Sequence, residues 1–250
     1  ERRILDASTA WPHQETEHTI CLVLDDSSPM HENGTAGYQQ IACLWQRHLG
    51  LAHCGVPYRV YLFSDLEVAE MPRYRSYLFP NLFEMNEERY ALLRRTALRD
   101  GQLAIFGPAT GITDGRQLTA EWISLLLDVE FELVRKSSPR RVLVHGTHPI
   151  TEAMPACTTY GDSYPYGPIL VPTRAAVNAG GFTMLGSAVA IWDINKPGLL
   201  LREFGAGAAG NGCTRHTRRG RLRRRLERRH AAARQSTARM RALRRQPYLV

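Results

Sequence analysis

Several features that would place a protein of this size in a common class are missing from this sequence. No stretch of about 18 apolar residues could span a bilayer, and the N-terminus lacks the apolar stretch of a signal peptide, so we expect a cytoplasmic protein without a membrane partner. The five cysteines are widely spaced and form no C-x-x-C pair, which indicates neither a disulfide framework nor a zinc site. The first residue is not Met, so we also expect a piece of a longer protein.

Lysine is almost absent as well, because 30 of the 32 basic residues are arginine. From Thr214 to Arg245 there are 14 arginines, no lysine and a single acid, Glu227. This segment carries a charge of +13, and since the whole chain carries +8, the remaining residues carry −5. The basic character therefore belongs to a tail, residues 213–250, and the body of the protein is mildly acidic.

Three interpretations of this Arg-rich tail compete. A nucleic-acid-binding arm would use the charge directly, but such arms usually mix lysine with arginine. A disordered or interaction tail is the second, because the few apolar residues give only a thin helical stripe. The third is a frameshift, since the arginine excess suggests a GC-rich gene, and GC-rich DNA read out of frame yields Arg, Ala, His and Pro. We favour the frameshift, which predicts an irregular or disordered tail and a domain without its last strand and helix.

The body shows strands alternating with helices. The apolar run from Thr19 to Leu24 ends in two aspartates, which is typical of a buried parallel strand followed by a polar loop. Further strands are predicted at 58–62, 76–79 and 102–106, and helices at 37–51, 86–99 with Asn86 as N-cap, and 118–127. Residues 131–205 are richer in β-structure, with strands predicted at 141–144, 168–171, 188–192 and 198–204. This alternation predicts an α/β, flavodoxin-like, doubly wound parallel sheet.

Ligands of such folds bind beyond the carboxyl ends of the strands. That rule makes candidate binding residues of those that follow the predicted strands, namely Asp25, Asp26, Asn81, Gly107 and Thr110.

Neither a nucleotide-binding site nor an amidotransferase-like catalytic site is supported by the sequence. Residues 205–210 have the spacing G-x-G-x-x-G, but no amphipathic helix follows, so no dinucleotide is expected, and residues 107–115 lack the lysine of a P-loop. An amidotransferase-like elbow would need Cys or Ser after the fourth strand, where the chain has Gly107, Pro108, Ala109 and Thr110. No catalytic residue and no cofactor are therefore expected.

Two further sets of polar residues are candidates for a binding or catalytic site. His145 and His148 follow a predicted strand, with Asp162 further on, and could bind a ligand or act as acid and base, although no carboxylate stands at metal-ligand spacing, so no metal is expected. The adjacent Asp25 and Asp26 are more typical of a turn or cap than of a glycosidase carboxylate pair, which usually sits in a (β/α)₈ barrel.

Two stretches, 45–66 and 71–83, resemble the trimerisation domain of family-42-type β-galactosidases. Leu185-Gly186, Asn195-Lys196-Pro197-Gly198 and Arg202-Glu203-Phe204-Gly205 are similar to the end of the same domain. The resemblance covers about residues 18–207. It implies a class I glutamine amidotransferase-like fold without the catalytic Cys that serves subunit assembly after a catalytic barrel. His148-Pro149-Ile150-Thr151 also resembles the trehalose-utilisation-like branch of that superfamily.

These observations together predict a lead-in at residues 1–17, an amidotransferase-like domain at 18–212 and the tail at 213–250. The expected function is that of a non-catalytic, trimerisation-like assembly domain of a glycoside hydrolase. Its expected partners are copies of itself and the barrel of the parent protein, with carbohydrate bound only through the parent enzyme and no nucleic acid. The alternative is a small hydrolase or sugar-binding domain that uses the loop of His145 and His148.

Overall fold

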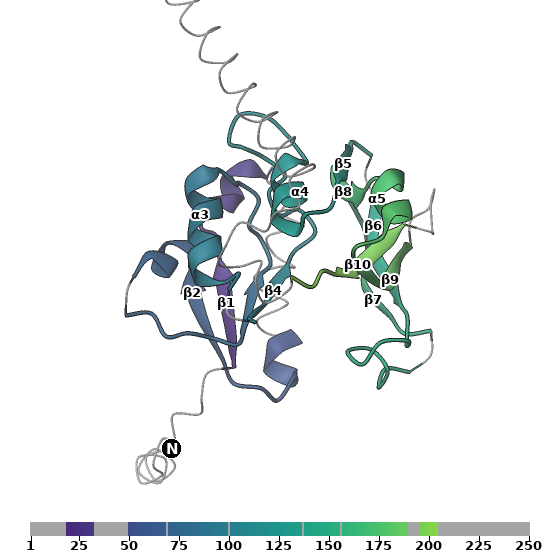
Figure 1. Ribbon diagram of the computed structural model, residues 1–250, viewed down its shortest axis with the longest axis horizontal. Coiled ribbons are helices and arrows are strands. Elements are labelled where there is room, and N and C mark those ends of the chain that lie inside the picture. The colour runs from purple at the N-terminus through teal and green to yellow at the C-terminus, as the bar shows by residue number, and fades with distance from the viewer. Residues whose placement is uncertain are drawn as a thin grey trace, which may run out of the picture.

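The computed structural model describes residues 19–32, 50–68, 70–99, 101–136, 138–155, 157–189 and 196–204. The predictions for the lead-in, for nearly all of the helix at 37–51, for the glycine-rich stretch at 205–210 and for the Arg-rich tail lie outside these residues. The described part is a mixed α/β structure with one parallel sheet and two antiparallel sheets (Figure 1). None of its helices has the length and apolarity that crossing a bilayer requires.

The first half of the chain builds a four-stranded parallel sheet. Its strands are β1 (Ile20–Leu24), β2 (Tyr58–Leu62), β3 (Ser76–Phe79) and β4 (Leu103–Phe106), in the order β2-β1-β3-β4. All three neighbouring pairs are parallel, and Leu22 stands level with both Val60 and Leu78. The four strands predicted from the sequence are confirmed.

This strand order is that of the first four strands of a flavodoxin-like sheet. No fifth parallel strand joins β4 among the residues that the structure describes, and helices are few. The predicted α/β class is therefore confirmed, whereas the finer flavodoxin-like and doubly wound assignment stays a prediction.

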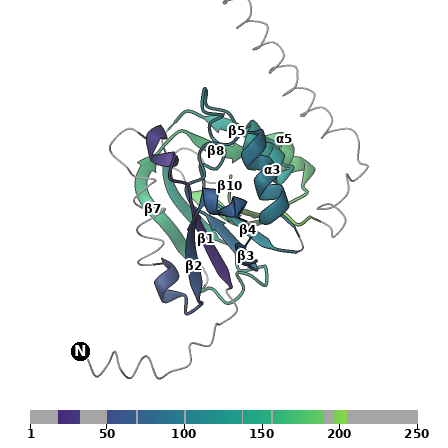
Figure 2. The same cartoon turned by 90° about the vertical axis from the view of Figure 1, so that its left-hand side faces the viewer.

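One face of the parallel sheet carries the main core. The connection from β2 to β3 begins with the 3₁₀ helix η4 (Phe63–Glu67), and the connection from β3 to β4 contains α3 (Glu87–Thr96). Side chains from both connections pack with alternate residues of the four strands. Figure 2 shows the four strands side by side, with α3 near β4 in that view. The core members from these elements are Cys21, Val23, Tyr77, Phe79, Phe63, Leu66, Leu92 and Leu93.

The ends of the helices follow the chemistry of their caps. The side chain of Asn86 accepts a hydrogen bond of 2.9 Å from the backbone N–H of Arg89, which confirms Asn86 as the N-cap of α3. The next helix, α4 (Glu121–Leu127), begins three residues later than predicted. The reason is that Leu118 forms a β-bridge with Thr113 and the N–H of Thr119 binds the carbonyl of Ile112, so this stretch is extended.

The second half of the chain is rich in β-structure, as predicted. The antiparallel sheet has the order β10-β9-β6-β7, and a two-stranded antiparallel sheet pairs β5 with β8. Figure 1 shows the antiparallel sheet beside α5, on the opposite side of the molecule from α3. The bounds are β5 (Phe131–Val134), β6 (Ser138–Val144), β7 (Thr159–Tyr166), β8 (Ile169–Pro172), α5 (Arg174–Ala179), β9 (Thr183–Val189) and β10 (Pro197–Leu201).

The strand predicted at 188–192 begins five residues earlier, because β9 spans Thr183–Val189, and residues 190–192 of the prediction lie outside the described part of the chain. Gly186 lies within this earlier part of the strand. A Cβ at that position would lie 2.6 Å from Cγ1 of Val142 and 2.9 Å from the carbonyl oxygen of Leu143, so only glycine lets β9 approach β6 here. A glycine inside the segment weakened the strand pattern in the sequence, although the fold requires that residue.

Candidate functional site

The carboxyl end of β1 leads into a buried polar cluster centred on Asp25. The side chain of Asp25 is 1% exposed. Its Oδ1 accepts hydrogen bonds from the N–H and the hydroxyl of Ser27 and from Nη2 of Arg89, at 3.2, 2.8 and 2.9 Å. Its Oδ2 accepts from the hydroxyl of Ser28 and from Nη1 of Arg89, both at 2.9 Å. The carboxylate is thus held by a two-pronged guanidinium contact and two serines.

Asn81 joins this cluster from the end of β3. Its Oδ1 accepts from the N–H of Asp25 at 3.0 Å, and its Nδ2 donates to the carbonyl of Asp25 at 2.8 Å. The residue is fully buried, so its side-chain amide pairs with backbone rather than with solvent. The hydroxyl of Ser28 contacts the carbonyl of Asn81 and accepts from the N–H of Phe83. These bonds fasten the loop after β1 to the loop after β3.

Burial and hydrogen bonding act on Asp25 in opposite directions. Burial alone would raise the pKa of the Asp25 carboxyl, but the hydrogen bonds and charge of Arg89, together with the two serines, outweigh it and hold that pKa below its ordinary value. For Arg89, burial would lower the pKa of the guanidinium, and the hydrogen bond and charge of Asp25 raise it instead. Asp25 and Arg89 are therefore a charged pair at neutral pH.

Arg89 reaches the carboxylate from the first turn of α3. Its Nη1 also donates to the carbonyl of Glu84 at 2.9 Å, and its guanidinium lies 4.7 Å from the centre of the Phe63 ring. The cation therefore packs on an aromatic face while it pairs with Asp25. These contacts connect β1, η4 and α3 at one point.

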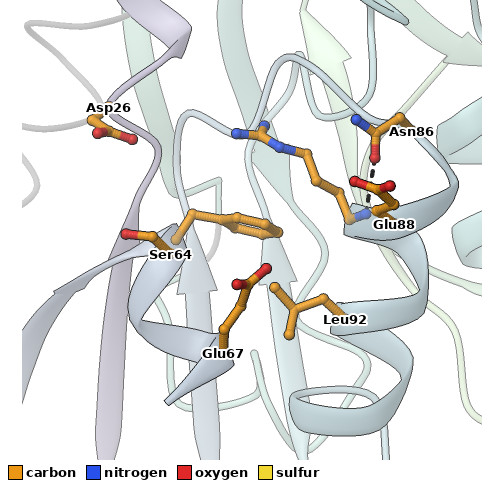
Figure 3. A pocket seen from close by; sticks show the side chains of 8 residues that line it. Asp26, Ser64, Glu67, Asn86, Glu88 and Leu92 are labelled. Carbon is orange, nitrogen blue, oxygen red and sulfur yellow. Dashed lines mark hydrogen bonds between the residues drawn. The ribbon is translucent and has the colours of Figure 1, made fainter.

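A groove of about 240 Å³ lies next to this cluster, between η4 and α3. Its walls include Asp26, Ser64, Glu67, Asn86, Glu88 and Leu92 (Figure 3). The volume is below the range of roughly 300–1,000 Å³ that is usual for small-molecule sites. Although three of these wall residues are acidic, no group of three or more His, Cys, Asp or Glu side chains in the described ranges is arranged to hold a metal ion.

The loop after β4 is packed against the loop after β3. The N–H of Gly107 donates to the carbonyl of Phe79 at 2.8 Å, and a Cβ on Gly107 would lie 2.1 Å from the carbonyl oxygen of Pro80. Thr110 is 1% exposed, and its hydroxyl has no hydrogen-bond partner within the described part of the chain. Among the described residues the Thr110 hydroxyl therefore has no hydrogen-bonded base of the kind that a nucleophile would need.

The two histidines belong to a turn at the end of β6 in the antiparallel sheet. The hydroxyl of Thr151 lies 2.5 Å from the carbonyl oxygen of His145 and 3.2 Å from that of His148, which closes the turn. Nδ1 of His148 accepts from the N–H of Ile150 at 3.1 Å. Nε2 of His145 lies 2.9 Å from the hydroxyl oxygen of Ser187 on β9. The imidazole of His148 thus supports its own turn, whereas that of His145 pairs with a hydroxyl.

The chain matches no protein-family model. It matches no curated protein either. Among solved structures it is similar to a β-galactosidase from Bifidobacterium adolescentis, with 13% sequence identity and a TM-score of 0.36 over 72% of this chain and 83% of that chain. A likeness at this level assigns no function.

The structure thus places the candidate residues in two regions. Asn81 pairs with the backbone of Asp25, Asp26 lines the neighbouring groove, and Thr110 lies in the loop after β4, while His145 and His148 share a turn in the other sheet. Whether any of them binds a ligand stays a prediction.

Two residues of these regions, Arg89 and Ser187, were not predicted from the sequence. Arg89 follows two acids in the first turn of α3. A cation next to a helix N-terminus is unfavourable, so an arginine there could have indicated a nearby carboxylate partner. Ser187 lies in a strand whose bounds were mispredicted, so its pairing with His145 could not be expected.

Proposed function

We propose that this chain is a non-catalytic, trimerisation-like assembly domain of a glycoside hydrolase. Its partners are other copies of the chain and a catalytic barrel of the parent protein, and it works in the cytoplasm. The observation that carries the proposal is the polar cluster at the carboxyl end of β1, where a ligand site of this architecture would be expected.

A catalytic carboxylate must exchange protons or contact substrate. The carboxylate of Asp25 instead accepts five hydrogen bonds from Ser27, Ser28 and Arg89, while such a group offers about four lone-pair positions. It is buried, and its lowered pKa keeps it charged at neutral pH. The group therefore fastens loops together, and no lone pair is left for a substrate.

The loop after β4 supports the same conclusion. An amidotransferase-like enzyme would place its nucleophile there, and this loop offers neither Cys nor Ser, while Thr110, at the expected position, is buried. The glycoside-hydrolase context comes from the resemblance of residues 45–66 and 71–83 to the trimerisation domain of family-42-type β-galactosidases. An inert strand-end region and that resemblance together favour assembly over catalysis.

Sedimentation velocity and an activity assay on the full chain test this proposal. The expected result is an oligomer whose sedimentation coefficient rises with concentration, together with no hydrolysis of a chromogenic β-galactoside above the buffer rate. A monomer at all concentrations would contradict the assembly role. Hydrolysis that disappears in a folded Asp25→Asn variant would contradict the non-catalytic role.

A second candidate function rests on the pair formed by His145 and Ser187. The distance of 2.9 Å between Nε2 and Oγ is within the range of a base and a nucleophile, and both residues are partly exposed. A small hydrolase or sugar-binding domain could use this loop together with His148. Alanine at His145 and at His148 distinguishes the two functions, because loss of ligand binding or turnover in folded variants would favour the second candidate.

A further inference from the structure

The two faces of the parallel sheet are occupied differently. Residues that pair across neighbouring strands point to the same face, and the row of Cys21, Tyr77 and Ala104 belongs to the main core. The adjacent row, Leu22, Val60, Leu78 and Ile105, points the other way. The core described above therefore accounts for one face only.

The opposite face is mainly apolar, and its centre is covered within the chain, because Leu22 is fully buried although it does not belong to the main core. The strands at the two edges are partly exposed. Val60 and Leu62 on β2 are 37% and 43% exposed, and Leu103 and Ile105 on β4 are 42% and 44% exposed. A parallel sheet normally has both faces covered, because its strands are apolar on both sides. This face needs an occupant.

The strand order predicts which connection between strands should lie on this second face of the sheet. A connection between parallel strands of one sheet is right-handed in about 98% of cases. The connections from β2 to β3 and from β3 to β4 progress across the sheet in one direction, and Phe63, Leu66, Leu92 and Leu93 place both on the core face. The connection from β1 to β2 progresses in the opposite direction. A right-handed crossover there must pass over the other face.

The length and the sequence pattern of the connection from β1 to β2 are suited to covering this face. It is anchored at Glu32 and Gly50, and residues 33–49 between them lie outside the described part of the chain. The sequence predicts a helix from 37 to 51 with Ile41, Leu44, Trp45, His48 and Leu49 on one face. A helix of 15 residues is roughly 22 Å long and a strand of five residues roughly 17 Å, so one such helix would span the sheet along its strands.

We infer that residues 37–51 dock their apolar stripe on the sheet face made by Leu22, Val60, Leu78 and Ile105. A second copy of the chain is the less suitable occupant, because Leu22 is already fully buried within one chain. The four side chains at the edges that are partly exposed provide far less than the ~800 Å² per partner of a stable interface. Covered in this way, the face is unavailable to other chains. Self-association would then use other surfaces, and the inference stands whether or not the chain assembles.

Photo-crosslinking of the full chain tests the docking directly. p-Benzoylphenylalanine replaces Val60, whose partial exposure leaves room for the larger ring. The matched control carries the same amino acid in place of Ala91, which is exposed on α3 on the core side of the sheet. Each protein is mixed with an equal amount of ¹⁵N-labelled wild-type chain before irradiation, and crosslinked peptides are identified by mass spectrometry.

The expected result is a crosslink from position 60 to a peptide within residues 37–51 of the same chain, and none from position 91 to that segment. A crosslink from position 60 to a labelled chain would overturn the inference in favour of a second copy. A crosslink to another part of the same chain, or none at all, would overturn it as well. Circular dichroism of each protein before irradiation establishes that the sheet is folded.

As a second measurement, Trp45→Glu is compared with Gln46→Glu, which adds the same charge one position off the stripe. Docking predicts that the urea midpoint falls in Trp45→Glu and stays near the wild-type value in Gln46→Glu. Equal midpoints in the two variants would overturn the inference. This test is independent of the crosslinking amino acid, so it holds even if that amino acid perturbs the sheet.

Discussion

At the scale of single residues, the carboxylate of Asp25 ties the loop after β1 to α3 through its contacts with Arg89. Its pKa is lower in the folded protein than the ordinary value of 3.8, so the folded state binds its proton less readily than the unfolded state does. The stabilisation from the pair with Arg89 is therefore complete above the unfolded pKa and is lost as the pH falls through the folded pKa. Stability should decline in the acid range below about pH 5.

Asp25→Asn should remove much of that acid dependence. At pH 7 the variant leaves the Arg89 guanidinium without its partner, and breaking a largely buried pair costs about 3–5 kcal/mol. Urea unfolding at several pH values measures both effects. Asp26→Asn removes the same charge from an exposed neighbour and should keep the wild-type stability at pH 7. A steep acid decline that survives in Asp25→Asn would show that other groups cause it.

Gly107 allows a second prediction at the same scale. A Cβ there would lie 2.1 Å from the carbonyl oxygen of Pro80, so the loops after β3 and β4 could not keep their present spacing. Gly107→Ala should lower the free energy of unfolding by about 1–3 kcal/mol, as overpacking does. Gly146→Ala is the matched control, because a Cβ at Gly146 meets nothing within 4 Å. Equal unfolding midpoints for the two variants would contradict the close approach.

At the scale of elements, local chemistry predicted more than long-range pairing did. The strands β1 to β4 and the cap of α3 could be predicted because short apolar runs and an Asn before two acids are local signals. β7, with its sequence TYGDSYPY, and the start of β9 escaped prediction, because pairing with β6 rather than their own pattern makes them strands. The role of Arg89 was not predicted for the same reason, because its partner Asp25 is 64 residues away in the sequence.

The cap of α3 gives the prediction that belongs to this scale. Asn86→Ala removes the acceptor for the N–H of Arg89 and should lower the free energy of unfolding by about 1 kcal/mol. Asn86→Asp keeps an acceptor at the same place and should stay near the wild-type value. Because the cap also positions Arg89 over Asp25, a loss well above about 2 kcal/mol in Asn86→Ala would mean that cap and ion pair are coupled.

At the scale of the whole molecule, the charge is divided unequally between body and tail. The strands and helices described here lie before residue 205, and the remaining 46 residues include the segment with a charge of +13. If that tail is read out of frame, it has no selected role in folding. Retention on DNA would then be a by-product of its arginines, and this retention should weaken steeply with salt.

A chain that ends at Gly212 tests this view. The truncated protein should keep the urea midpoint of the full chain, because the buried core side chains named above all come from residues 21–185. It should also lose the salt-sensitive retention on DNA, since what remains carries a charge of −5. A full chain in which seven arginines of the tail are changed to glutamine separates charge from length, and it should lose most of the retention at an unchanged midpoint. A clear fall of the midpoint on truncation would instead make the tail part of the fold, and the frameshift hypothesis would then fail.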